Sequence, residues 1–300
     1  MNGRLFNRIV RVVAQQQPPP SSFVGKNRSF FEVVDVGIEI DKLRIEFDVT
    51  QNLGSEPNKC EIKIFNLSPD DRAYFDRKPT KVTLLAGYDN VPRLLFTGDL
   101  VTASTERVAG VDNVTTITVS DGMRAYAHAR MRTKSYKPPM TWLRILQDCA
   151  ATWNQQLPDE LLKNAELKQS IAAGVSVHGP TRDIVTRILA SYGIGWSFQN
   201  GKLVTLSDGE ARPGDIVPVN EDTGLLNSPK VTAPEAASAS GKGKPSEIKF
   251  DMLLYPELAP GKQVRIESAF LSATAKVVDV KHSGNNRDGK YMSSATAKVV

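Results

Sequence analysis

Residues Leu43–Ser68 read LRIEFDVTQNLGSEPNKCEIKIFNLS, and this stretch decides the fold. Apolar residues alternate with polar or charged ones in both halves, first at Leu43, Ile45, Phe47 and Val49 and then at Cys60, Ile62 and Ile64. Because successive side chains of a strand point to opposite faces, this alternation predicts two strands of a sheet with one buried and one solvated face. A Gly/Pro/Asn-rich turn region joins the two strands.

Length and composition allow two domains or three small ones. The chain has 300 residues, 40% hydrophobic content and a formal net charge of +5. This mildly basic character permits contact with acidic surfaces, but it is far from that of a dedicated nucleic-acid binder. No segment approaches the roughly 20 apolar residues that span a bilayer, so we expect no membrane insertion. Cys60 and Cys149 are interpreted as two buried free thiols of a protein made in a reducing cytoplasm, with a disulfide as the alternative.

Residues 1–27 are interpreted as an N-terminal arm or linker. They begin with a basic segment that holds a short apolar run, and the sequence QQQPPP at Gln15–Pro20 then breaks any helix. The arm is expected to be either an interaction tail or a partly disordered leader.

Residues 28–122 are predicted to form a first β-barrel domain. Short segments rich in β-branched or aromatic residues alternate there with turn signals, which is typical of a barrel or sandwich. A short helix is predicted to begin at Ser68, with Pro69 at its first position. The strand candidates are Phe30–Ile40, Leu43–Val49, Cys60–Phe65, Lys81–Tyr88, Arg93–Thr97 and Val114–Ser120.

Residues 123–212 are predicted to form a small α+β domain. Apolar side chains from Trp142 to Trp153 recur on one helical face behind the N-cap residue Thr141. A second helix is predicted at Thr181–Tyr192. The dipeptide Asn-Gly between two alternating segments predicts a hairpin, with strands at Ile194–Phe198 and Lys202–Leu206.

Residues 213–300 return to β character and are predicted to form a second β-barrel domain. The stretch Ala233–Lys244 has the composition of a flexible loop. The heptapeptide SATAKVV occurs at Ser272–Val278 and again at Ser294–Val300, a spacing that suits two strands of one long hairpin. The strand candidates are Leu225–Val231, Ile248–Leu254, Gln263–Glu267, Ala275–Val280 and Ser294–Val299.

No motif for catalysis, cofactor binding or metal binding emerges from the sequence. The chain lacks a Walker-type loop and the patterns GxGxxG, GxSxG and HExxH. His128, His178 and His282 have no partner at metal-ligand spacing, so we expect surface or hydrogen-bonded histidines. Cys149 lies on an apolar helical face, which favours packing over a nucleophilic role. We therefore assign no catalytic, cofactor-binding or metal-binding residue.

The basic stretch RAYAHARMRTKSYK at Arg124–Lys137 is the one candidate interaction surface. Positive charge interleaved with aromatic rings is how single-stranded nucleic acids are bound, because the charges track phosphates and the rings stack on bases. A solvated linker or a subunit contact is the other interpretation, and the two stay open here. The residues of the candidate surface are Arg124, Arg130, Arg132, Lys134 and Lys137.

Across residues 40–300 the chain resembles the baseplate hub proteins of tailed phages, which join the tail tube to the central spike. The resemblance follows the order β, α+β, β and rests on a series of short matching pieces. These are Leu43–Val49, Ser55-Glu56-Pro57-Asn58, Ile62–Ser68, Ala86-Gly87-Tyr88, Leu95–Asp99, Ser120-Asp121-Gly122, Gly179–Leu189, Trp196–Leu206, Thr223–Leu226, Ser228-Pro229, Leu253–Ser268 and Lys281–Gly289.

The resemblance implies a mainly β structural protein of the virion, in which two tube-like β-barrel domains flank an α+β domain. It implies a homotrimer whose six barrels match a sixfold tail tube above and a threefold spike below. The implied partners are the tail tube or distal tail protein, the central spike, baseplate wedge proteins and the tape-measure protein. DNA would pass through the central channel without specific binding, and assembly would take place in the host cytoplasm.

Two competing functions follow from the residues. A nucleic-acid-binding module would use the stretch 124–137. A tail-associated cell-wall-degrading enzyme would need a further domain with a carboxylate pair or a metal site, for which the three expected domains leave no room.

Overall fold

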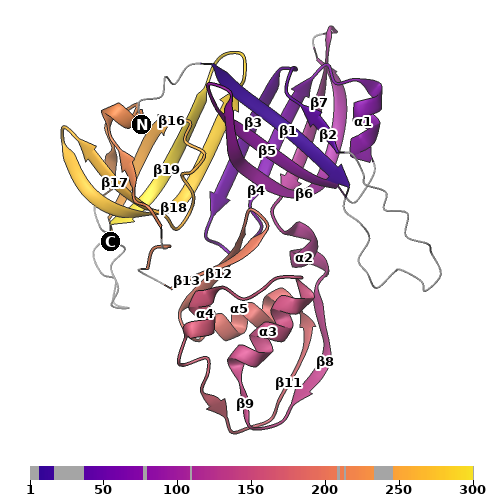
Figure 1. Ribbon diagram of the computed structural model, residues 1–300, viewed down its shortest axis with the longest axis vertical. Helices are drawn as coiled ribbons and strands as arrows, with labels where there is room; N and C mark the ends of the chain where they lie inside the picture. Colours follow the sequence, from indigo (N-terminus) through magenta and orange to yellow (C-terminus); the bar gives the residue numbers. More distant parts are fainter. Residues whose placement is uncertain are drawn as a thin grey trace.

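The computed structural model describes residues 7–16, 37–76, 80–108, 110–207, 210–212, 214–232 and 246–299. The protein is mainly β, as the sequence predicts. Two β segments lie side by side, and an α+β segment projects from them along the longest axis of the molecule (Figure 1). Each of the three segments has a hydrophobic core cluster of its own.

The first β segment forms around the decisive stretch of sequence. Ile45, Phe47 and Val49 are buried together with Cys60, Ile62 and Ile64, so the alternating faces lie as predicted. Each large apolar side chain buried in this way contributes roughly 1.5–3 kcal/mol. The elements are β1 (Arg8–Gln16), β2 (Ile38–Ile40), β3 (Ile45–Asn52), β4 (Lys59–Phe65), α1 (Pro69–Asp76), β5 (Thr80–Tyr88), β6 (Val91–Val108) and β7 (Asp112–Ser120).

The α+β segment packs helices on two-stranded sheets. The hydroxyl of Thr141 accepts a hydrogen bond from the Arg144 amide and caps α3, as predicted. Asn200 and Gly201 both have positive φ, and they form the predicted turn between β12 and β13. The elements are α2 (Met123–His128), β8 (Arg130–Tyr136), β9 (Met140–Thr141), α3 (Trp142–Thr152), α4 (Asp159–Lys163), β10 (Ser170–Ile171), β11 (Val175–Pro180), α5 (Thr181–Ala190), β12 (Ile194–Gln199) and β13 (Lys202–Ser207).

The second β segment contains the long hairpin that the repeated heptapeptide suggests. The two copies of the repeat lie largely on β18 and β19, which pair antiparallel. The elements are β14 (Val217–Val219), a 3-10 helix η2 (Glu221–Thr223), β15 (Lys230–Thr232), β16 (Glu247–Leu253), β17 (Gln263–Ser268), β18 (Leu271–Asn285) and β19 (Tyr291–Val299).

A single 13-stranded sheet runs through both β segments in the order β15-β16-β19-β18-β3-β4-β7-β6-β5-β1-β2, with β17 and β14 branching from β18. The two segments meet where β18 pairs antiparallel with β3, from Asp279 opposite Asn52 to Asn285 opposite Glu46. The backbone hydrogen bonding therefore continues without a break from one segment to the other.

Two expectations need correction, and a third lies outside the described residues. Residues 8–16 do not belong to a separate arm, because β1 pairs with β5 along its whole length and buries Val10, Val12 and Ala14. The strand expected at Leu225–Val231 is reduced to the short β15 and an isolated bridge at Leu225, since η2 and its turn precede it. The proposed loop Ala233–Lys244 lies outside the described residues.

Tyr291 ties the second β segment into the first. Its hydroxyl accepts a hydrogen bond from the Gly87 amide at 3.0 Å and lies 2.8 Å from the Ile9 carbonyl, to which it can donate. Its ring packs edge-on against Phe47 and Tyr88, and the Arg8 guanidinium lies over it. One side chain of β19 thus joins β1, β3 and β5.

Replacing Tyr291 with Phe is expected to lower the free energy of unfolding by about 1–3 kcal/mol, because buried backbone groups of Ile9 and Gly87 lose a partner. Denaturant unfolding at equilibrium measures the loss. Tyr192→Phe is the matched control, since the Tyr192 hydroxyl makes no hydrogen bond to any described residue. An equal effect of both substitutions would contradict the role assigned to Tyr291.

Candidate functional site

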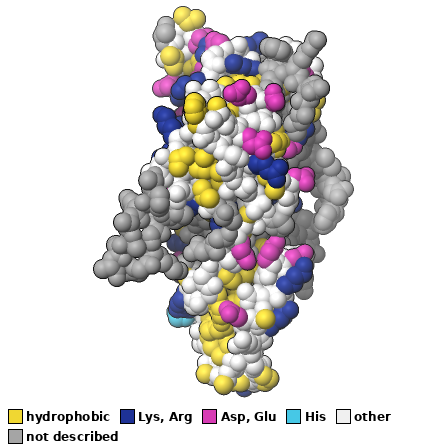
Figure 2. Space-filling model, turned by 90° about the vertical axis from the view of Figure 1, so that its left-hand side faces the viewer, with side chains coloured by type: hydrophobic (Ala, Val, Ile, Leu, Met, Phe, Trp, Pro, Cys, Tyr) yellow, Lys and Arg dark blue, Asp and Glu magenta, His cyan; other side chains and the backbone are white. Residues whose placement is uncertain are grey.

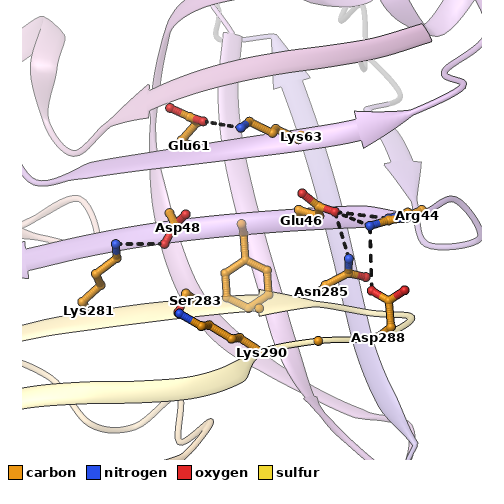
Figure 3. Close-up of a pocket in the computed structure, with 13 residues that line it drawn as sticks. Arg44, Glu46, Asp48, Glu61, Lys63, Lys281, Ser283, Asn285, Asp288 and Lys290 are labelled. Atoms are coloured by element: carbon orange, nitrogen blue, oxygen red, sulfur yellow. Dashed lines mark hydrogen bonds and ion pairs between the residues drawn. The ribbon is translucent and has the colours of Figure 1, made fainter. Parts of the chain in front are cut away.

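The polar face of the junction between β3 and β18 is hollowed by a cavity of about 430 Å³ (Figure 3). Its walls carry ion pairs: Lys281 lies 3.3 Å from Asp48, Lys63 lies 3.3 Å from Glu61, and Arg44 lies 2.7 Å from Glu46. Exposed pairs of this kind each contribute little to stability. The lining holds four basic and four acidic residues, which are Arg44, Lys63, Lys281 and Lys290 and Glu46, Asp48, Glu61 and Asp288.

A second hollow of about 700 Å³ continues along the same face over β18, β19 and β16. Lys281 lines both hollows, and the second one again mixes signs, with Lys230 and Lys249 against Asp251 and Asp279. Acidic and basic side chains are interspersed on the side of the molecule in Figure 2 as well. The polar face of the shared sheet is therefore charge-balanced.

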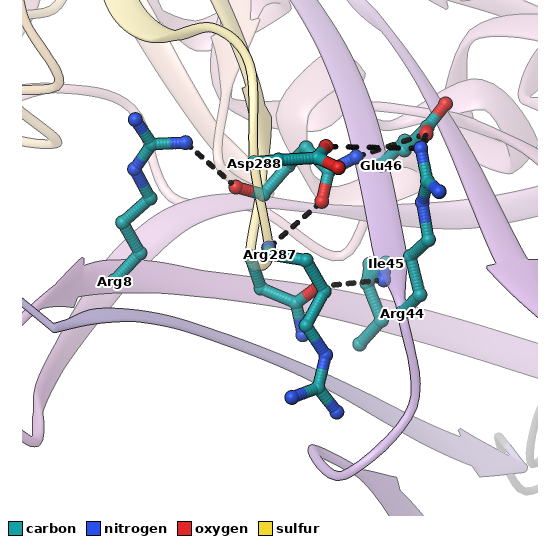
Figure 4. A network of polar contacts seen from close by, with 8 residues as sticks. Arg8, Arg44, Ile45, Glu46, Arg287 and Asp288 are labelled. Atoms are coloured by element: carbon teal, nitrogen blue, oxygen red, sulfur yellow. Dashed lines mark hydrogen bonds and ion pairs between the residues drawn. The ribbon is translucent and has the colours of Figure 1, made fainter.

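The turn between β18 and β19 clamps the junction at one end (Figure 4). The Asn286 side chain accepts a hydrogen bond from the Ile45 amide at 2.9 Å and donates to the Leu43 carbonyl at 2.7 Å. Asn285 donates to the Glu46 carboxylate at 2.9 Å, and Arg287 donates to the Lys42 carbonyl at 2.7 Å. These bonds extend the strand pairing beyond the last residues of β18.

Asp121 attaches the α+β segment to the first β segment. Its fully buried carboxylate accepts hydrogen bonds from the amides of Asn200 at 2.5 Å and Gly201 at 2.7 Å, in the turn between β12 and β13. Burial raises the pKa of Asp121 to about 6, against the opposing effect of these two hydrogen bonds. The carboxylate thus holds the hairpin turn against the end of β7.

Further polar contacts surround Asp121. Asn58 donates from its side chain to the Phe198 carbonyl at 3.0 Å, and Gln199 donates to the Asn52 carbonyl at 2.6 Å. Gly122 has φ of +61°, and a Cβ there would lie 2.6 Å from the Phe198 ring, so glycine is required for the close contact. The interface between the two segments is consequently specific and tightly packed.

The five residues of the candidate basic surface come from three places, α2, β8 and the residues after β8, and Arg130, Arg132 and Lys134 alternate along one side of β8. Arg124 lies on α2, where its amide donates to Asp99, and Lys134 forms an ion pair of 2.6 Å with Asp148. Arg130 and Arg132 on β8 and Lys137 beyond it are exposed. Lys134 is exposed as well, but its charge is paired with Asp148.

The two tyrosines of the same stretch are engaged within the protein. Tyr126 packs against Trp196 and under the Arg182 guanidinium, and Tyr136 donates a hydrogen bond of 2.6 Å to Asp148. Neither ring stands out as a free platform on which bases could stack. The aromatic rings that a single-strand binder would use to stack on bases are therefore engaged in contacts within the protein.

The titratable groups that the sequence singles out are placed as expected. His282 is buried, its Nε2 lies 3.2 Å from the Leu258 carbonyl and its Nδ1 lies 2.7 Å from the Ser293 hydroxyl; burial lowers its pKa to about 4. His128 and His178 are exposed. Cys60 and Cys149 are free and buried, and burial raises the pKa of both thiols.

Within the part of the chain that the structure describes, no group of three or more His, Cys, Asp or Glu side chains could hold a metal ion. None of the described helices has the length and apolar character to cross a membrane.

Sequence reasoning missed the residues that matter most at the two junctions. Asp121 lies within the Ser120-Asp121-Gly122 piece of the resemblance, but nothing in the sequence says that it meets a turn 80 residues away. Tyr291 belongs to no motif that the sequence analysis singled out.

The fold is shared with tail proteins of phages and prophages. The chain is similar to the 43 kDa tail protein of prophage MuSo2 from Shewanella oneidensis, with 8% identity, 96% of both chains covered and a TM-score of 0.62. It is similar to the tail protein from Neisseria meningitidis MC58, with 10% identity, 98% of this chain and 97% of the other covered and a TM-score of 0.61.

A third similar structure is a type VI secretion system component of E. coli, described as similar to the T4 bacteriophage tail proteins gp27 and gp5. The identity is 12%, the coverage is 86% of this chain and 73% of the other, and the TM-score is 0.55. No family model and no curated protein sequence matches the chain. The resemblance to phage tail proteins is thereby confirmed at the level of the fold.

Replacing Asp121 with Asn is expected to change how stability depends on pH. Because the folded pKa is raised, the contribution of Asp121 is full below its unfolded pKa near 4 and is lost as the pH rises through about 6. Between pH 4 and pH 7 the wild type should lose up to about 3 kcal/mol relative to Asp121→Asn. Urea unfolding across this range measures the difference.

The control for this experiment is Asp89→Asn, at an exposed turn of the first β segment. Its profile should run parallel to that of the wild type. A parallel profile for Asp121→Asn as well would show that Asp121 does not titrate as inferred.

The double variant Arg130→Ala, Arg132→Ala tests the nucleic-acid interpretation. Since Tyr126 and Tyr136 are engaged, we expect wild type and variant to bind a short single-stranded oligonucleotide equally weakly. Fluorescence anisotropy at increasing salt concentrations measures the binding. Tight wild-type binding that falls steeply with salt and disappears in the variant would establish a nucleic-acid surface instead.

Proposed function

We propose that this chain is a structural virion protein, the central baseplate hub of a phage tail. Three copies would form a ring that adapts a sixfold tail tube to a threefold spike and encloses part of the genome-ejection channel. The observation that carries the proposal is the single sheet that joins two β segments through β3 and β18. Two such segments in each of three copies supply six similar units.

In this proposal the domains are a first tube-like barrel at 28–122 that also includes β1, the α+β domain at 123–212 and a second tube-like barrel at 213–300. The partners are the tail tube or distal tail protein, the spike, baseplate wedge proteins and the tape-measure protein. The likeness to the E. coli component that is described as similar to the T4 tail proteins gp27 and gp5 supports a place in the tail.

The charge-balanced polar face suits a channel wall. Excess positive charge along a channel would bind phosphates and slow the passage of DNA, whereas interspersed signs leave no continuous basic track. Both hollows at the junction combine acidic and basic side chains, which supports this face as the lining. The protein acts in this scheme by assembly, without a catalytic residue or a cofactor, and it works in the virion after assembly in the host cytoplasm.

The first test of the proposal is molar mass and symmetry. Light scattering should give three times the 32.9 kDa of one chain, and negative-stain averages should show a threefold ring with a central hole. A stable dimer without a hole contradicts the proposal. If the purified protein is a monomer, the threefold ring is sought in purified tails that contain it. Absence of the ring from those tails also contradicts the proposal.

A further inference from the structure

The strand pairing of the first β segment is repeated in the second. The order β3-β4-β7-β6-β5 corresponds to β15-β16-β19-β18-β17, and every neighbouring pair is antiparallel in both series. The chain also visits the strands in the same sequence in both, from β3 to β7 and from β15 to β19. The two segments are therefore copies of one pattern of pairing.

Two irregularities fix the correspondence residue by residue. The pairing of β6 with β7 shifts register between Leu100 and Thr102, and that of β18 with β19 shifts between Val277 and Asp279. When residues are counted from each shift toward the end of its strand, Thr102–Val108 of β6 corresponds to Asp279–Asn285 of β18. Both stretches end where their strand ends.

The two corresponding stretches differ in their second partner. Asp279–Asn285 lies between β19 and β3, whereas Thr102–Val108 pairs only with β7 among the described strands. All of its residues except Ala103 are exposed. The second half of β6 is thus an open edge at the place where β18 meets a neighbouring segment.

The strand that corresponds to β3 is β15, and it is also an open edge. Its three residues pair only with β16 among the described strands, and all three are exposed, with Val231 at 53%. Following the pairings through β16 and β4, Lys230–Thr232 occupies the place of Asp48–Thr50. Among the described strands, each molecule therefore has two edges without a partner, Thr102–Val108 and β15. These edges correspond to the two sides of its internal junction, β18 and β3.

We propose that β15 of one copy pairs antiparallel with Thr102–Val108 of a second copy and so repeats the β3–β18 junction between subunits. The internal register transfers directly, because Asp48 lies opposite Ser283 and Thr50 lies opposite Lys281. It places Lys230 opposite Glu106, Val231 opposite Thr105 and Thr232 opposite Ser104.

The chemistry of the two edges fits this register. Residues directly opposite each other in an antiparallel pair lie on one face, so Lys230 meets a carboxylate of opposite charge. The contact also covers the exposed side of Val231.

The contact is head-to-tail, since it joins different surfaces of the two copies. Such contacts give a closed ring when the rotation from each copy to the next brings the last copy back to the first. The number of copies in that ring rests on the proposed function, whereas the contact itself rests on the repeated pairing. The occupant of both edges is therefore a second copy of this chain.

Disulfide cross-linking tests the register. In the double variant Thr105→Cys, Val231→Cys the two cysteines lie directly opposite each other on different subunits, with Cα atoms about 5 Å apart, a separation that a disulfide can bridge. The native Cys60 and Cys149 are buried and can stay. Mild oxidation should link most chains into closed trimers on a non-reducing gel. The control Arg107→Cys, Val231→Cys shifts the register by two residues and should link several-fold less.

A charge exchange tests the same contact without oxidation. Glu106→Lys and Lys230→Glu should each weaken self-association about tenfold at each contact, and the double exchange should restore most of the loss. Sedimentation at several concentrations measures the association. Losses that simply add in the double variant would speak against a direct contact between the two side chains.

The outcomes separate this contact from the proposed function. Closed trimers linked through positions 105 and 231 support both. Open chains of linked molecules support the contact and overturn the trimeric ring. A threefold ring without this link, or with equal linking in the shifted control, overturns the contact and leaves the hub proposal standing. An absence of any intermolecular link in a monomeric preparation also overturns the contact.

Discussion

The ladder between β3 and β18 is the constraint on which the rest of the structure depends. It places Gly284 opposite Phe47, and a Cβ at Gly284 would lie 2.5 Å from the Phe47 ring and 2.6 Å from that of Tyr291. Only glycine therefore lets both rings close over the ladder, and only then does Tyr291 reach Ile9 and Gly87. The junction, the first core and the placement of β1 form one interdependent unit.

Aromatic and charged side chains have different roles around this unit. Aromatic rings go into packing, as the cluster of Trp153, Trp196 and Phe198 and the contacts of Tyr126 illustrate. Charged side chains gather on the polar face of the sheet, where signs alternate and most partners are exposed. Such a surface is well suited to remaining soluble without binding one sign of ligand strongly.

Local patterns predicted much of this architecture. The alternation in β3 and β4, the cap at Thr141 and the Asn200-Gly201 turn depend on neighbouring residues, and the structure confirms all three. The strand β1 was missed because the prolines that follow it suggested an arm, although Val10, Val12 and Ala14 alternate correctly. The roles of Asp121 and Tyr291 could not be predicted, since their partners are distant in sequence and their burial is established only by the folded structure.

The position of Tyr291 in the chain has a consequence for biosynthesis. Its hydrogen bond to Ile9 spans 282 positions, and the first core also contains Leu254. A chain that emerges N-terminus first can form the β3–β4 hairpin early, but it cannot complete its first core until Tyr291 has been made. Chains that end before Tyr291 would leave the paired residues Ile9 and Gly87 without the hydrogen bonds and the ring that cover them. The first core is therefore complete only in chains that extend at least as far as Tyr291.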